Sequence, residues 1–211
     1  MPIMSDKWIK FKAENDQLIV PFHAESRSSN EDGTPVTSYG LSSFGYDIRL
    51  GNIFRFFNRG NSNNLNVEVR SVRDSIGPDV IDPVNFNEAL TSCHELRDDE
   101  CITIPPHGFM LGVSKERIKL DNEFTAICME KSTLARCGLC VTVTPLEAGW
   151  EGYVTLELSN KTDSPIKLTP GMGICQVLFI HGNESCEVSY ADRNGKYQDQ
   201  PAEPVLPRRK M

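Results

Sequence analysis

The sequence predicts a mostly β protein with a few short helices. Short apolar runs recur along the chain, several of them alternate with polar residues, and proline or glycine separates them. Strands at this spacing are typical of a closed barrel or a two-layered β architecture. With 211 residues and 39 % hydrophobic content, the chain is expected to form one domain over 1–211.

The elements are expected in the following order. Ser5 and Asp6 begin a short amphipathic helix, and the polar, turn-rich stretch 24–39 is interpreted as a loop. The charged stretch 60–98 is interpreted as an excursion with a short helix near 83–90. The expected strands are 46–50, 52–57, 101–104, 108–113, 124–129, 139–143, 153–158 and 173–180. The polar tail, 192–211, is by itself more typical of a frayed chain end than of a flap over a ligand.

Composition narrows the classes of function. A formal net charge of −7 argues against a nucleic-acid coat or a membrane-surface protein, which normally carry a basic face. No window approaches the roughly 18 apolar residues of a membrane span. The start of the chain lacks the apolar core of a signal peptide, and seven cysteines, an odd number, favour reduced thiols. We therefore expect a soluble cytoplasmic protein.

Two fragments resemble the metal site of zinc nucleobase deaminases, which combine H-x-E with P-C-x-x-C. His23–Glu25 and Cys137–Cys140 supply the fragments, but Arg136 stands where proline is required, and more than a hundred residues separate them. A buried free cysteine needs no metal to explain it. The sequence is therefore expected to hold no zinc.

The segment 131–136 has the composition of a phosphate-binding turn. Ser132 through Arg136 is expected to form one helical turn that places these two side chains on one side. Exposed backbone N–H groups with Lys131 and Arg136 would suit a phosphate. From these residues alone, an ordinary capped turn with solvated charges is the favoured interpretation.

A β-hairpin follows this turn and presents a carboxylate. Alternation along residues 153–159 sets Val154, Leu156 and Leu158 on one face and the tyrosine, threonine, glutamate and serine on the other. Glu157 suits a general base if burial raises its pKa toward neutrality. The alternative is a solvated outer face, where hairpins often carry such a glutamate.

An ordered set of motifs adds a resemblance to a known family. The motifs are Ser42–Arg49, Lys131–Gly138, Val143–Glu147, Trp150–Asn160, Gln176–Phe179 and Tyr190–Gln198. In this order the chain resembles the deoxycytidine triphosphate deaminases, relatives of the trimeric dUTPases. Each motif alone is modestly specific, but together they span most of residues 38–200.

The resemblance implies a distorted β-barrel, a homotrimer with active sites between subunits, and a tail that closes over the nucleotide. It implies hydrolytic removal of the 4-amino group of dCTP, which gives dUTP and ammonia without zinc. Mg²⁺ would be bound through the nucleotide triphosphate, so no protein metal ligands are expected. The expected partners are dCTP, dUTP and, as an inhibitor, dTTP, with no nucleic acid and no membrane.

The resemblance also implies roles for individual residues. Glu157 matches the general base, while Ser132 and Arg136 match residues that position the water and support the transition state. The residues that match substrate contacts are Lys131, Ser132, Thr133, Leu134, Ala135 and Arg136 in the triphosphate cradle, Thr155, Leu156 and Glu157 at the base, and Gln176, Tyr190, Lys196 and Gln200 at the phosphates and sugar.

Three alternatives remain open at this point. A bifunctional enzyme that converts dCTP to dUMP and pyrophosphate, or a dUTPase, would share most of these motifs. Glu147 stands where relatives often have aspartate, and residues 200–207 lack the glycine usual before the last proline. A non-catalytic nucleotide-sensing module would be expected to have lost part of the set Ser132, Arg136 and Glu157, and the sequence retains all three.

Overall fold

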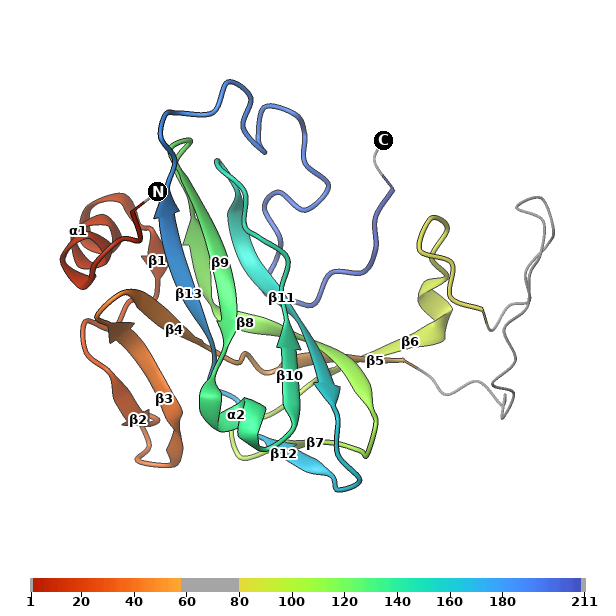
Figure 1. Cartoon of the computed structure of the whole chain (residues 1–211). Helices are drawn as coiled ribbons and strands as arrows, with labels where there is room; N and C mark the ends of the chain where they lie inside the picture. Colours follow the sequence, from red (N-terminus) through yellow and green to blue (C-terminus); the bar gives the residue numbers. More distant parts are fainter. Residues whose placement is uncertain (1, 58–79, 210–211) are drawn as a thin grey trace.

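The computed structural model describes residues 2–57 and 80–209, which form three β-sheets (Figure 1). The first sheet has the order β10 (Leu139–Thr142), β11 (Glu151–Asn160), β8 (Phe109–Lys119), β5 (Ile53–Phe57) and β6 (Thr91–Glu95), and β1 (Ile19–Val20) pairs with β8. β8 extends past the predicted end at residue 113, because Ser114 and Glu116 are buried with hydrogen-bond partners instead of ending the strand. The antiparallel pairing of β10, β11 and β8 makes this sheet the platform for the candidate chemistry.

The second sheet has the order β2 (Arg27–Ser29), β3 (Pro35–Ser42), β4 (Gly45–Arg49), β13 (Gly173–His181) and β9 (Phe124–Glu130), and the third pairs β12 (Ile166–Leu168) with β7 (Ile102–Ile104). The prediction of a loop over 24–39 is wrong, since β2 and β3 form a hairpin there. The polarity that suggested a loop belongs to an edge strand, and all three residues of β2 are exposed.

One hydrophobic core lies between the two larger sheets. It includes Ile48 and Val177 from the second sheet and Met110 and Leu156 from the first, all almost fully buried. An ion pair also crosses this interior: Arg49 Nε lies 2.6 Å from Glu116 Oε1, and the Arg49 backbone N–H donates to Glu116 Oε2 at 2.7 Å. Such a pair is tolerated in a core because both charges are matched and hydrogen-bonded.

The mostly β class is confirmed, but the strands do not pair as a closed barrel. Among the described residues they form three separate sheets. The chain passes from β4 to β5 at Leu50 and Gly51, where an isolated bridge from Leu50 to Ser114, which includes the hydrogen bond from Gly51 N to Val113 O, meets β8. Too few hydrogen bonds form at this crossing to join the two large sheets into one ring.

The helices are short, as the sequence predicts. α1 (Asp6–Asp16) begins after Ser5 and buries Ile9 and Ala13, beside the second sheet in Figure 1. α2 (Ser132–Arg136) is the predicted helical turn. In place of the helix expected near 83–90 there is one 3₁₀ turn, η1 (Glu88–Leu90), while most of the excursion from 60 lies outside the described residues. None of the described helices has the length and apolar content needed to cross a membrane.

Candidate active site

The alternation predicted for β11 is confirmed. Val154, Leu156 and Leu158 are at most 1 % exposed, whereas Thr155 and Glu157 are half-buried on the opposite face. The period of two in a β-strand therefore directs the carboxylate away from the hydrophobic core. It also places the Leu156 side chain in that core, so only the backbone of Leu156 is available for the predicted contact with a base.

Glu157 lies in the middle of the first sheet. Its partners across the strands are Leu111 on β8 and Thr142 on β10. Burial alone raises the pKa of Glu157 above its ordinary value of 4.5. Within the described part of the chain no hydrogen bond or ion pair holds its carboxylate. An unpaired carboxyl with a raised pKa is suited to accept a proton near neutral pH.

A cavity of about 900 Å³ opens beside Glu157. Its walls come from β11, from the 143–150 turn and from the tail, and Phe57, Phe109 and Leu111 form an apolar side. Of the sequence-predicted site residues, those that line it are Thr155, Glu157, Tyr190, Lys196 and Gln200. The structure therefore brings the proposed base together with the predicted tail residues, in a volume typical of a small-molecule site.

The tail is packed against the β11 hairpin, so the interpretation as a frayed end is wrong for its described part, 192–209. The Trp150 indole N–H donates to the Tyr197 carbonyl at 2.8 Å, and the Tyr197 N–H donates to the Tyr190 hydroxyl at 3.0 Å. Figure 1 shows this segment curling back beside β11. Hydrogen bonds to distant residues and the burial of Pro204 and Leu206 hold this segment in place, and its polar composition does not reveal either.

Gly152 permits the closest approach of the tail. A Cβ atom at this position would lie 2.6 Å from the backbone nitrogen of Gln200, and the φ of Gly152 is +149°, which favours glycine. The Tyr153 N–H donates to the Gln200 carbonyl at 3.0 Å, and the Asp199 N–H donates to the Glu151 carbonyl at 2.8 Å. The tail thereby adds a short parallel bridge to the end of β11.

An ion pair also joins the tail to the 143–150 turn. Arg193 contacts the Glu147 carboxylate, and its guanidinium lies 5.3 Å from the centre of the Tyr190 ring. Both charged residues line the cavity. Glu147 stands out in the sequence as a departure from relatives, but its ion-pair partner Arg193 was not predicted.

The remaining predicted residues surround α2. Leu134 is buried in the core, while Ser132, Thr133, Ala135 and Arg136 are exposed. A single buried anchor therefore leaves the other side chains of the helical turn directed to solvent. This arrangement presents a hydroxyl and a guanidinium on the same surface, as the spacing predicted.

Lys131 forms an ion pair and a hydrogen bond with residues of the same chain. Its Nζ lies 2.5 Å from Asp47 Oδ2 and 3.3 Å from the hydroxyl of Ser38. Burial raises the pKa of Asp47, and the hydrogen bond and charge of Lys131 partly oppose that rise. Gln176 lies directly across from Asp47 and donates to the Ser42 hydroxyl at 2.9 Å. Asp47 belongs to the motif that carried the resemblance, but its partner is 84 residues away and was not foreseen.

Within one chain, the predicted site residues therefore form two groups, one that lines the cavity beside Glu157 and one on and around α2. Throughout the described residues, no hydrogen bond or ion pair joins Glu157 to Ser132 or Arg136. Asn160, three residues beyond Glu157 on β11, pairs with Leu139, the first residue after the turn that ends α2. At about 3.3 Å per residue, the base lies about 10 Å from that end of the strand.

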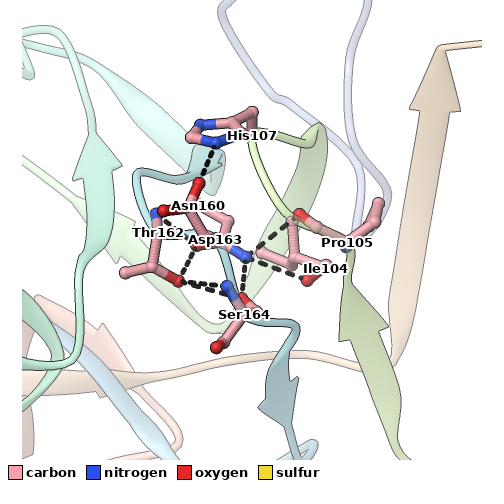
Figure 2. A network of polar contacts seen from close by, with 7 residues as sticks. All are labelled: Ile104, Pro105, His107, Asn160, Thr162, Asp163 and Ser164. Carbon is pink, nitrogen blue, oxygen red and sulfur yellow. Dashed lines mark hydrogen bonds and ion pairs between the residues drawn. The ribbon is translucent and has the colours of Figure 1, made fainter.

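A polar network, which the sequence analysis did not identify, supports α2 at this end of β11 (Figure 2). The buried Asn160 amide donates to the carbonyls of Ile104, Pro105 and Ser164 at 2.7–3.1 Å, and its oxygen accepts from Thr162. Thr162 in turn contacts Gly138, where a Cβ would lie 2.2 Å from the threonine methyl group. Asn160 thus positions the loop on which the end of α2 rests.

The fragments that resemble a zinc site lie in different surroundings. His23 packs edge-on against the Tyr39 ring at 5.2 Å, whereas Cys140 contacts Thr142 at 3.8 Å. The described residues contain no group of three or more His, Cys, Asp and Glu placed to hold a metal ion.

Comparison with known proteins identifies the family of the chain. A model of the dCTP deaminase-like family matches residues 3–182. A dCTP deaminase of Burkholderia cenocepacia is 44 % identical over 200 residues, which cover 95 % of this chain and 96 % of that protein, and one of Burkholderia mallei matches equally. A solved structure of 2′-deoxycytidine 5′-triphosphate deaminase from Agrobacterium tumefaciens is similar in fold, with a TM-score of 0.53 and 20 % identity over 85 % of this chain and 48 % of its own, about half its length. By its sequence along nearly its whole length, the chain belongs to the dCTP deaminase-like family.

Proposed function

We propose that the protein hydrolyses dCTP to dUTP and ammonia. The observation that carries this proposal is Glu157, a half-buried carboxyl with a raised pKa that no side chain in the described ranges neutralises, beside a cavity of nucleotide size. The identity of 44 % with curated dCTP deaminases supports the choice of substrate.

The proposed mechanism uses this carboxylate twice. Glu157 takes a proton from a water molecule as the water adds to C4 of the cytosine, and it passes this proton to N3. In its second use Glu157 takes the proton of the new C4 hydroxyl and gives it to the 4-amino group, so that the C4–N bond breaks, ammonia leaves and the C4 carbonyl of dUTP forms. Thr155, Tyr190, Lys196 and Gln200 line the same cavity and are proposed to hold the nucleotide in place for this addition.

Ser132 and Arg136 are proposed to act on the same reaction from a second copy of the chain. In one protomer they lie on exposed α2, apart from Glu157. The exposed outer faces of Ile127 and Met129 on β9, together with Phe44, offer apolar surface for such a contact. A homotrimer with shared sites would bring the helical turn of one subunit to the cavity of the next.

Mixing two inactive variants tests the shared site. Glu157→Gln and Arg136→Ala are each expected to lose most of the activity when assayed alone. If sites are shared, subunits unfolded and refolded together regain part of the wild-type activity, because some sites then combine an intact α2 with an intact Glu157. Sedimentation measures the oligomer, and mixed trimers without recovered activity would contradict the proposal.

We propose that Mg²⁺ enters with the triphosphate and that no zinc takes part. Of the two glutamates that line the cavity, Glu147 is already bound to Arg193, which argues against a metal-binding pair. Lys196, which also lines the cavity, is proposed to neutralise phosphate charge. Metal analysis of the purified protein tests this, and stoichiometric zinc needed for turnover would contradict it.

The product assay distinguishes deamination from the related reactions. The protein is incubated with dCTP and Mg²⁺, and ammonia, dUTP and pyrophosphate are measured in parallel. Ammonia with accumulating dUTP supports the proposal, whereas pyrophosphate in step with ammonia identifies a bifunctional enzyme. Binding of dCTP without turnover would identify a nucleotide-sensing module. Adding dTTP tests the proposed inhibition.

The proposed setting is the cytoplasm, with nucleotides and not nucleic acids as partners. All seven cysteines are free thiols in the structure, and the net charge is −7. Fractionation of cells that express the protein checks the location.

A further inference from the structure

A chain of hydrogen bonds crosses from the tail to the cavity through Thr155. The Val205 backbone N–H donates to the Thr155 hydroxyl oxygen at 3.1 Å, and the hydroxyl donates to Gln200 Oε1 at 2.8 Å. A backbone N–H can only donate, so the threonine oxygen acts as acceptor toward Val205 and its proton is directed to Gln200. All three residues line the cavity.

The backbone of Gln200 is held independently of this chain. Its carbonyl accepts from the Tyr153 N–H at 3.0 Å, and its nitrogen packs against Gly152. With the backbone fixed, the contact with Thr155 decides which end of the Gln200 amide faces the strand. In the described part of the chain no hydrogen bond uses Gln200 Nε2, which keeps two N–H donors available to a ligand.

The geometry points to Thr155 as a positioning residue that orients the Gln200 amide. Its hydroxyl holds Oε1, so that Nε2 presents donors to an acceptor oxygen of the bound nucleotide. Thr155 thereby acts through Gln200, and this role differs from the direct contact with the base that the family resemblance implied. The ligand's identity rests on the proposed function, while the orienting role of Thr155 does not.

Three substitutions test this role by dCTP affinity and KM. Thr155→Val keeps the shape but removes both hydrogen bonds, and it is expected to raise the Kd and KM for dCTP about tenfold, the loss of about one hydrogen bond. Thr155→Ser keeps the hydroxyl and should restore both values to within about twofold. In a Gln200→Ala background, Thr155→Val should cost nothing further. The exposed Thr103→Val is the matched control.

Additive effects of Thr155→Val and Gln200→Ala would overturn the inference, because a threonine that contacts the base directly would act independently. Failure of serine to rescue would also overturn it. An NMR measurement on the free protein separates this inference from the proposed function: the Gln200 side-chain amide signal, identified by its loss in Gln200→Glu, should shift in Thr155→Val and not in Thr155→Ser. If it shifts while the wild type releases no ammonia, only the proposed function fails.

Discussion

The cavity beside β11 and the surface of α2 are built in opposite ways. In the cavity, the base Glu157 is half-buried, the tail forms one wall, and the cation Arg193 has a carboxylate partner in the same chain. On α2, Ser132 and Arg136 are exposed, and Leu134 alone anchors the turn in the core. One chain by itself encloses the first region, whereas it leaves the polar side chains of the second region exposed to solvent. The difference teaches that burial within one chain tunes the base, whereas the cation of α2 lies exposed, as the proposed contact with a second chain requires.

The largest expected effect comes from the cavity. Glu157→Gln should lower kcat about a thousandfold, the middle of the 10²–10⁴-fold that a general base contributes, while binding of dCTP stays measurable. Ammonia release measures kcat, and calorimetric titration measures the binding of dCTP. The exposed Glu187→Gln serves as control. Activity within a few fold of the wild type would remove Glu157 as the base.

A smaller loss of kcat is expected from a substitution on α2. Arg136→Ala should lower kcat about a hundredfold, the order seen when one group that stabilises a transition-state charge is removed. Because Arg136 is exposed, the melting temperature should not change. Lys167→Ala, also at an exposed position, is the control. A large drop in melting temperature would show that α2 is a structural element and not a half-site.

The ion pair between Lys131 and Asp47, next to α2, can be tested by measuring the stability of the protein. Asp47→Asn should lower the free energy of unfolding by about 2 kcal/mol, because it leaves the largely buried Lys131 ammonium without its charged partner. Denaturant titration measures the change. Asp163→Asn removes an exposed pair with His107 and should cost less than about 1 kcal/mol. Equal losses in the two variants would mean that burial does not distinguish these pairs.

The smallest expected effect concerns pH. Because burial raises the pKa of Glu157 in the folded state, the folded protein binds more protons than the unfolded chain just above pH 4.5, and wild-type stability falls as pH rises through that window. Glu157→Gln lacks this loss, so it should melt slightly higher than the wild type at pH 7 and equally at pH 4. The acid limb of kcat/KM should lie above pH 4.5. A limb at or below that value would contradict the environment described for Glu157.

The sequence predicted the local features of both regions and missed the contacts between distant segments. The α2 turn and the outward face of Glu157 follow from helical and strand periodicity within a few residues. The Lys131–Asp47 pair spans 84 residues and the Thr155–Gln200 bond spans 45, and no periodic pattern encodes either. The barrel was expected from strand spacing and resemblance, yet closure depends on hydrogen bonds at Leu50 that spacing does not determine.

Asn160 limits which substitutions and which changes in loop length the protein can accept. Its amide donates to carbonyls of two loops that are far apart in sequence, at Ile104–Pro105 and at Ser164. Aspartate would set a negative oxygen against those carbonyls, and leucine would leave them unsatisfied. An insertion in either loop would pull its carbonyls out of reach of the same amide. The two loops are therefore expected to change length only in concert, although the strands β8 to β11 separate them in the sequence.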